Sequence, residues 1–172
     1  EALAGAPGVY TLVDIEKIGV MGHSLGGSAA LGIGRVRSDI SAVIALESPF
    51  MFDIRGVENG EFVLTREPYP VPVLNVYSDS AWSHLSEWPQ YAVNDALLSD
   101  DHPATFNVHI SGLGHLGLTD LALSSPLLVR LADGAKPTRD SVEGLRIINE
   151  VCLEFFDTYL KNQGEFRLTV NP

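Results

Sequence analysis

The sequence has few of the features that would indicate a disulfide framework, a basic binding surface or a membrane span. Its 172 residues include one cysteine, Cys152, so no disulfide can form within the chain. Lysine and arginine number 11 against 22 acidic residues, and the formal net charge is -11 at pH 7. This balance argues against nucleic acid or an anionic membrane as the partner, because both bind basic patches. No apolar run approaches the roughly 18 residues of a membrane-spanning helix.

Short apolar runs alternate with helical patterns along the rest of the chain. Buried strands are expected at 17–21, 41–46, 71–77 and 105–110, and the first helix at 25–36. A long final helix is expected from apolar residues at helical spacing between Leu145 and Tyr159, with Gly164 as its stop signal. This alternation predicts an α/β fold with a mainly parallel sheet and helices on both faces, in a single domain over residues 1–172.

Two connections are longer than ordinary loops, and both begin where an expected strand ends. They cover residues 47–70 and 78–104. Connections of this length usually carry function or small elements of their own. Because doubly wound sheets place their sites at the carboxyl ends of the strands, these two segments are expected to border the site.

Ser24 stands in Gly22-His23-Ser24-Leu25-Gly26, between an expected strand and an expected helix. A nucleophile on so tight a turn has backbone close on either side, so glycine is expected two residues before and after it. The turn lifts the hydroxyl above the sheet edge and leaves the N–H of Leu25 at a helix start, where it can bind an oxyanion. The pattern predicts Ser24 as a nucleophile; the alternative is a serine that caps an ordinary turn.

GHSLGG, at residues 22–27, resembles the nucleophile elbow of the α/β-hydrolase superfamily. The resemblance extends over nearly the whole chain, which looks like the C-terminal half of such an enzyme. It implies that the N-terminal part of the fold is missing here, together with the second oxyanion donor. We therefore expect the remainder of a longer polypeptide to complete the sheet.

A general base must reach the serine from a loop at the same sheet edge. His115 follows the last expected strand, and Gly112 and Gly114 allow the chain to turn back over the site. Superfamily members commonly present their catalytic histidine in such a context, so His115 is the expected base. The other histidines are expected to be structural or to lie in loops: His23, His84, His102 and His109.

The histidine needs a carboxylate, and two candidates directly follow strands. Glu47 lies in AVIALESPF and Asp79 in VLNVYSDSAW. Most superfamily members carry the acid after the later strand, at a position that falls near Ala81 here, slightly after Asp79. Platelet-activating-factor acetylhydrolases and pancreatic-type lipases carry it after the earlier one, and IALESPFMF resembles that segment although those families usually have aspartate. Glu47 is therefore the expected acid, with Asp79 as the alternative and Asp53 or Asp120 behind it.

Aromatic residues near these acids suggest a substrate wall. Trp82, His84 and Trp88 follow Asp79, whereas Phe50, Met51 and Phe52 follow Glu47. They are expected to bind an apolar acyl or aryl group, with self-anchoring of the loop as the alternative. No pair of histidines has metal-ligand spacing and no nucleotide-binding signature is present, so neither metal nor cofactor is expected.

These features predict a serine hydrolase that cleaves a short-chain or lipid-type carboxylic ester through an acyl-enzyme. A small-molecule or lipid-like ester is the expected partner, and nucleic acid is not. The triad leaves a serine peptidase, an acyltransferase or a polyester hydrolase open as alternatives. A non-catalytic binding module is a further alternative, although intact Ser24 and His115 argue against it.

Overall fold

The four expected strands form one parallel sheet in the order β1-β2-β5-β6. The computed structural model describes residues 8, 12–65, 67–99, 104–134 and 137–167. The strands are β1 (Ile18–His23), β2 (Ile40–Leu46), β5 (Val73–Tyr77) and β6 (Thr105–His109). The first strand runs two residues further than expected, to His23, because it stays paired with β2 up to the turn. The elbow serine therefore follows the sheet directly.

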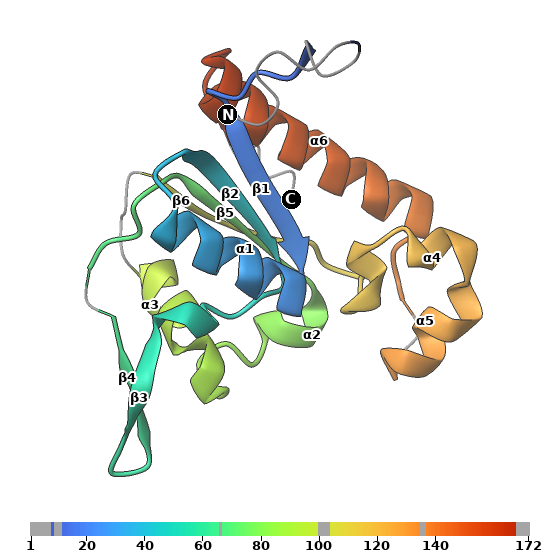
Figure 1. The fold of residues 1–172 in the computed structure, drawn as a ribbon. Coiled ribbons are helices and arrows are strands. Elements are labelled where there is room, and N and C mark those ends of the chain that lie inside the picture. The colour runs from blue at the N-terminus through green and yellow to red at the C-terminus, as the bar shows by residue number, and fades with distance from the viewer. Residues whose placement is uncertain (1–7, 9–11, 66, 100–103, 135–136, 168–172) are drawn as a thin grey trace.

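Helices cover both faces of this sheet, as predicted. Helix α1 (Leu25–Val36) lies on one face and α6 (Ser141–Lys161) on the other (Figure 1). Side chains of β2 alternate between the two, because successive residues of a strand point to opposite faces. Val43 packs with Leu31 of α1, whereas Ile44 packs with Ile148 of α6. A strand buried on both faces explains why its sequence is an unbroken apolar run.

The final helix begins and ends at polar caps. The carboxylate of Asp140 accepts hydrogen bonds from the N–H groups of Val142 and Glu143 at 3.0 and 3.1 Å. The helix ends at Lys161 and is capped by Asn162, whose φ is 55°, so Asn162 and not Gly164 is the stop signal. Asparagine tolerates this left-handed conformation better than most side chains do. Among the described residues, no helix combines the length and the apolar character that crossing a bilayer requires.

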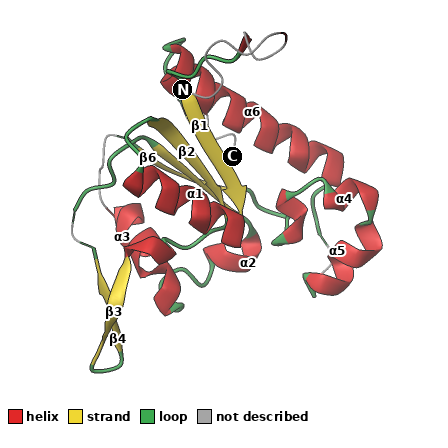
Figure 2. Cartoon of the chain, in the orientation of Figure 1, coloured by secondary structure: helices red, strands yellow, loops and turns green. Residues whose placement is uncertain are grey.

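The long connections carry small elements of their own (Figure 2). After β2 come η2 (Met51–Asp53), β3 (Ile54–Glu58) and β4 (Glu61–Leu64). After β5 come α2 (Asp79–Trp82), η3 (Pro89–Tyr91) and α3 (Ala92–Ser99). After β6 come η4 (Leu116–Leu118), α4 (Leu121–Ser124) and α5 (Pro126–Ala132). The β3–β4 hairpin projects from the body, whereas the segments directly after β2, β5 and β6 meet at the carboxyl edge of the sheet.

The fold predicts that α6 holds the sheet through Phe155 in particular. Its side chain is 0% exposed and contacts the rings of Phe106 and Phe166. Phe155→Ala is expected to lower the free energy of unfolding by about 3–5 kcal/mol, because it removes the ring and leaves a cavity. Leu153→Ala, at a position of the same helix that is 59% exposed, is the control and should cost under about 1 kcal/mol. Equal losses in urea unfolding would contradict this assignment of the core.

Candidate active site

Ser24 is the single residue between β1 and α1, and its backbone conformation is strained. Its φ is 54° and its ψ is -125°, a backbone conformation that residues other than glycine rarely adopt. Its N–H donates to the carbonyl of Leu46 at 2.9 Å, which ties the turn to the end of β2. Leu25 begins α1, so its N–H lies in the first turn, where no intrahelical acceptor is available. The local geometry is therefore the predicted strand-to-helix elbow.

The glycines around Ser24 have different steric roles. A Cβ at Gly22 would lie 2.3 Å from the carbonyl oxygen of Gly26, and one at Gly27 would lie 1.9 Å from Ser48 Oγ. Apart from its chain neighbours and the nearby backbone of its own helix, a Cβ at Gly26 would meet no described atom within 4 Å. The sequence interpretation, which required glycine two residues on either side, is therefore correct for Gly22 and wrong for Gly26. The close approach after the serine falls one residue later, because α1 packs its Gly27 against the loop that follows β2.

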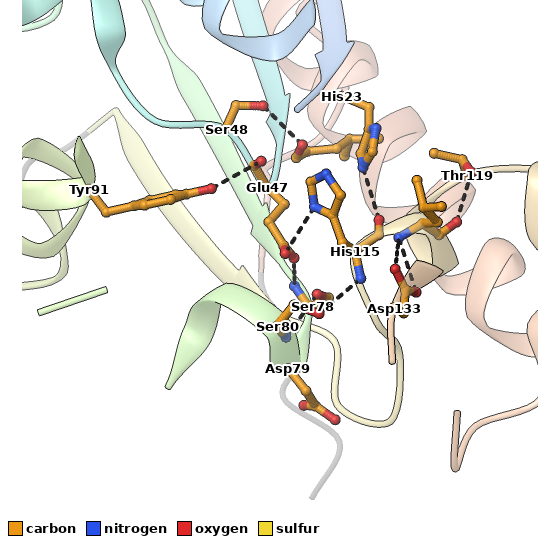
Figure 3. A network of polar contacts seen from close by, with 12 residues as sticks. His23, Glu47, Ser48, Ser78, Asp79, Ser80, Tyr91, His115, Thr119 and Asp133 are labelled. Atoms are coloured by element: carbon orange, nitrogen blue, oxygen red, sulfur yellow. Dashed lines mark hydrogen bonds and ion pairs between the residues drawn. The ribbon is translucent and has the colours of Figure 1, made fainter. Parts of the chain in front are cut away.

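Glu47 and His115 come together from two different strand ends (Figure 3). Glu47 follows β2 directly and is 2% exposed. Its Oε1 lies 3.1 Å from His115 Nδ1, and its Oε2 accepts a hydrogen bond from the N–H of Ser78 at 2.7 Å. Both carboxylate oxygens thus have donors, as a buried carboxylate requires.

These contacts define which nitrogen of His115 carries its proton. A carboxylate only accepts, so Nδ1–H of His115 donates to Glu47, and Nε2 is left with its lone pair available. The hydrogen bond to Glu47 raises the pKa of His115 above its ordinary value, and the charge of Asp133 acts in the same direction. Burial opposes this shift of the pKa but is the smaller influence. The arrangement therefore favours a histidine that takes up a proton at Nε2.

Backbone strain is concentrated at the two residues predicted as nucleophile and acid. In the described part of the chain, the non-glycine residues with positive φ are Ser24, Glu47, Asn59 and Asn162. The two asparagines belong to a hairpin turn and a helix end, where this conformation is common. Ser24 and Glu47, with φ of 54° and 47°, are residue types that rarely adopt this conformation. Strain of this kind typically clusters at functional sites.

His23 lies against His115 on the side of the elbow. Its Nε2–H donates to the carbonyl oxygen of His115 at 2.9 Å, and the two ring centroids are 4.4 Å apart. Burial lowers the pKa of His23, and the neighbouring His115 lowers it further. The hydrogen bond and the ring contact together brace the loop that carries His115.

Asp133 is a neighbour of the site that the sequence interpretation missed. Its carboxylate accepts a hydrogen bond from the N–H of Leu116 at 3.0 and 3.2 Å to its two oxygens. Gly114 packs so closely that a Cβ there would lie 2.4 Å from Asp133 Oδ2. Asp133 follows α5 in an ordinary polar stretch, and no motif marks it. Only the packing of α5 brings it to the residue after His115.

The other candidate acids have partners elsewhere. Asp79 Oδ1 lies 2.8 Å from His109 Nε2, and its Oδ2 accepts from the N–H of Gly112 at 2.8 Å. Asp53 is buried and forms an ion pair with Arg35 at 2.8 Å. Asp120 lies at the start of α4. Among the described residues, Glu47 is the only one of these candidate acids that contacts His115. His102, one of the histidines considered in the sequence, lies outside the described residues.

A cavity of about 380 Å³ opens above these residues. The residues that line it are Ser24, Leu25, Ser28, Glu47, Pro49, Met51, Ser80, Trp88, Gln90, Tyr91 and His115. Ser24 and His115 therefore share one cavity. Within the ranges that the structure describes, no cluster of three or more His, Cys, Asp or Glu side chains has the makings of a metal site.

The predicted substrate-contacting residues divide between this cavity and its surroundings. Trp88 lines the cavity, and His84 stacks behind it with ring centroids 5.0 Å apart. Trp82 stacks on His109 at 4.9 Å and lies outside the lining. Phe50 is also outside it, because its ring is buried in the core against Tyr69. Of the three residues expected to form an apolar wall after Glu47, Met51 lines the cavity and Phe50 does not.

The parallel sheet, the strained serine turn and the Glu47–His115 pair define an α/β-hydrolase fold. Residues 9–169 match the family model described as platelet-activating factor acetylhydrolase, isoform II. The chain belongs to this family. No curated protein matches the chain by sequence.

Solved structures of acylaminoacyl peptidase from Pyrococcus horikoshii have a similar fold. The orthorhombic crystal form has 16% identity and a TM-score of 0.52, covering 89% of this chain and 26% of that one. The uncomplexed form has 16% identity and a TM-score of 0.51, covering 90% and 26%. A Mycobacterium tuberculosis puromycin-hydrolyzing peptidase gives 14% identity and a TM-score of 0.49, covering 86% and 22%. The chain thus spans about a quarter of the first relatives. The family match and the shared fold therefore agree with each other.

The elbow predicts opposite outcomes for two adjacent glycines. Gly27→Ala is expected to destabilise the protein by about 1–3 kcal/mol, because the new methyl group collides with Ser48 Oγ and the carbonyl of Gly22. Gly26→Ala should be neutral or add up to about 1 kcal/mol, since alanine is the better helix former. Thermal and urea unfolding of both variants test this; a larger loss for Gly26→Ala would refute the packing described.

Proposed function

We propose that this protein is a serine ester hydrolase in which Ser24, His115 and Glu47 form the catalytic triad. One observation carries the proposal: buried Glu47 hydrogen-bonds His115 Nδ1 beside a cavity that Ser24 also lines. The order Ser, acid, His along the chain is that of α/β-hydrolases. Membership of an acetylhydrolase family supports an ester as the substrate.

In the proposed reaction, Ser24 Oγ attacks the ester carbonyl while His115 Nε2 takes up the hydroxyl proton. The imidazolium that forms is stabilised by Glu47, whose carboxylate is held by Ser78 at the same time. His115 then returns the proton to the leaving alcohol, and an acyl group remains on Ser24. Water, activated by the same histidine, releases the acid and restores the serine.

The developing oxyanion is assigned to the N–H of Leu25. This group lies in the first turn of α1, directly after the nucleophile, and the helix dipole adds to its electrostatic effect. The side chain of Leu25 is exposed, so it leaves room for substrate at the cavity mouth. Removing one oxyanion donor typically costs about 10²–10³ in kcat, which shows the scale of its contribution.

An apolar acyl group fits the cavity better than a strongly charged one. Met51 and Trp88 supply apolar surface, and Gln90 and Tyr91 supply neutral polar groups. In the described lining the ionisable side chains are those of Glu47, Tyr91 and His115, with no lysine or arginine to bind a carboxylate. The alternative is a peptidase, which is what the structural relatives are named for. Identity of 16% or less supports only the shared fold.

Ser24→Ala is expected to abolish ester hydrolysis. Loss of the attacking hydroxyl should reduce kcat/KM for p-nitrophenyl butyrate by about 10³-fold or more in the full-length protein. Covalent labelling by a fluorophosphonate should disappear as well. Ser28→Ala is the matched control, because Ser28 lines the same cavity but donates its hydroxyl to the carbonyl of Pro49. An active Ser24→Ala variant would overturn the proposal.

Glu47→Gln is expected to lower both the rate and the pKa of the general base. The rate of hydrolysis should fall by about 10³–10⁴-fold, because an amide no longer holds the correct tautomer or stabilises the imidazolium. Glu47 raises the pKa of His115, so its loss should move the acidic limb of the kcat/KM profile to lower pH.

The comparison variant for Glu47→Gln is Asp79→Asn, which changes the alternative acid. It should leave the position of the acidic limb unchanged and keep activity within about fivefold of wild type. A collapse of activity in Asp79→Asn with a mild effect of Glu47→Gln would reassign the acid to Asp79.

A further inference from the structure

We propose that Asp79 is a positioning residue that fixes the loop carrying His115, and that it acts together with its neighbours Ser78 and Ser80. The inference rests on the proposed function, since it assigns His115 as the group being positioned. Asp79 does not line the cavity, so its effect must pass through the loop.

Three separate contacts join Asp79 to the chain between β6 and His115. Its carboxylate meets His109 Nε2 through one oxygen and the N–H of Gly112 through the other, each at 2.8 Å. Its own N–H donates to the carbonyl of Leu113 at 3.0 Å. One residue thus holds the start and the middle of the segment that leads to His115.

The loop depends on such anchors because it has no regular structure of its own. Gly112 adopts a φ of 84°, which turns its N–H toward Asp79. Its carbonyl accepts the N–H groups of Thr138 and Arg139 at 3.0 and 3.1 Å. A Cβ at Gly112 would lie 2.8 Å from Thr138 Oγ1, so the loop is tightly enclosed at this point.

Ser78 and Ser80 extend the same clamp to both partners of the Glu47–His115 pair (Figure 3). The N–H of Ser78 donates to Glu47 Oε2 at 2.7 Å, and Ser80 Oγ accepts the N–H of His115 at 3.1 Å. Three consecutive residues therefore contact the acid, the loop and the histidine. Their position at the start of α2 sets the separation between Glu47 and His115.

The partner of Asp79 on the strand is itself held in place. His109, the last residue of β6, stacks on Trp82 with a centroid distance of 4.9 Å and an interplanar angle of 5°. Because Trp82 belongs to α2, the Asp79–His109 contact links the helix to the strand end from which the loop departs. This arrangement accounts for Trp82 lying outside the cavity.

The test compares Asp79→Ala with Asp79→Asn in the full-length protein. Alanine removes every side-chain contact, whereas the amide oxygen of asparagine can still accept from Gly112 and its NH₂ can donate to a neutral His109. Asp79→Ala should lose about 10- to 100-fold in kcat with less than about threefold change in KM, as expected for a displaced base. Asp79→Asn should retain activity within about fivefold.

An NMR titration of the His115 ring provides a readout that needs no catalysis. The charged and titratable groups that act on this ring are Glu47, Asp133 and His23. If the clamp sets the Glu47–His115 hydrogen bond, Asp79→Ala should lower the pKa of His115, and Asp79→Asn should leave it nearly unchanged. Asp39→Ala, which removes an ion-paired carboxylate at the opposite end of β2, is the control for loss of a charge.

Each outcome has a distinct meaning. A lower Tm in Asp79→Ala with unchanged kcat and unchanged His115 pKa would overturn the inference and leave a purely structural role. An equal fall of the pKa in the alanine and asparagine variants would also overturn it, because charge and not position would then be the cause. A wild-type protein that fluorophosphonate does not label would refute the proposed function, while the titration would still decide whether Asp79 positions His115.

Discussion

The hydrogen bond between Glu47 and His115 is the interaction on which the site depends. Its two partners follow different strands, β2 and β6, which are separated in the sheet by β5. A carboxylate buried to 2% exposure is costly unless its oxygens have donors, and here His115 and Ser78 provide them. The parallel sheet makes this possible, because it brings the carboxyl ends of its strands to one edge.

The same edge also carries the strain that the site requires. Ser24 and Glu47 both adopt positive φ directly after neighbouring strands. The N–H of Ser24 donates to Leu46, and the N–H of Glu47 donates to Val76, so each strained residue is tied to the next strand of the sheet. A sheet packed on both faces resists the relaxation of these turns, and the hydroxyl and the carboxylate are held in place before any substrate binds.

Much of the fold and part of the site could be predicted from local patterns. The strands could be recognised in the sequence because burial on both faces demands continuous apolar runs. Helix α6 could be recognised because its apolar residues recur at helical spacing on one face. The elbow could be recognised in the sequence because a tight turn leaves little room for side chains near the serine and so favours glycine there. The sequence did not show that the close approach after the serine is at Gly27, because that contact is made with Ser48 of another segment. The sequence grouped Phe50 and Met51 as one apolar wall, but only packing separates them: Phe50 is buried in the core and Met51 lines the cavity.

By itself, the sequence determined the fold class, the strand-to-helix turn at Ser24 and the small set of acids and histidines that follow strand ends. Each of these follows from a local rule of burial, periodicity or backbone sterics. Only the tertiary structure decided how the candidates pair: Glu47 with His115, and Asp79 with His109 and Gly112. The resemblance of IALESPFMF to a lipase-type segment favoured Glu47 as the acid, but it did not give the partners of Asp79. The contacts of both carboxylates are set by the register of strands far apart in the chain, which no local pattern encodes.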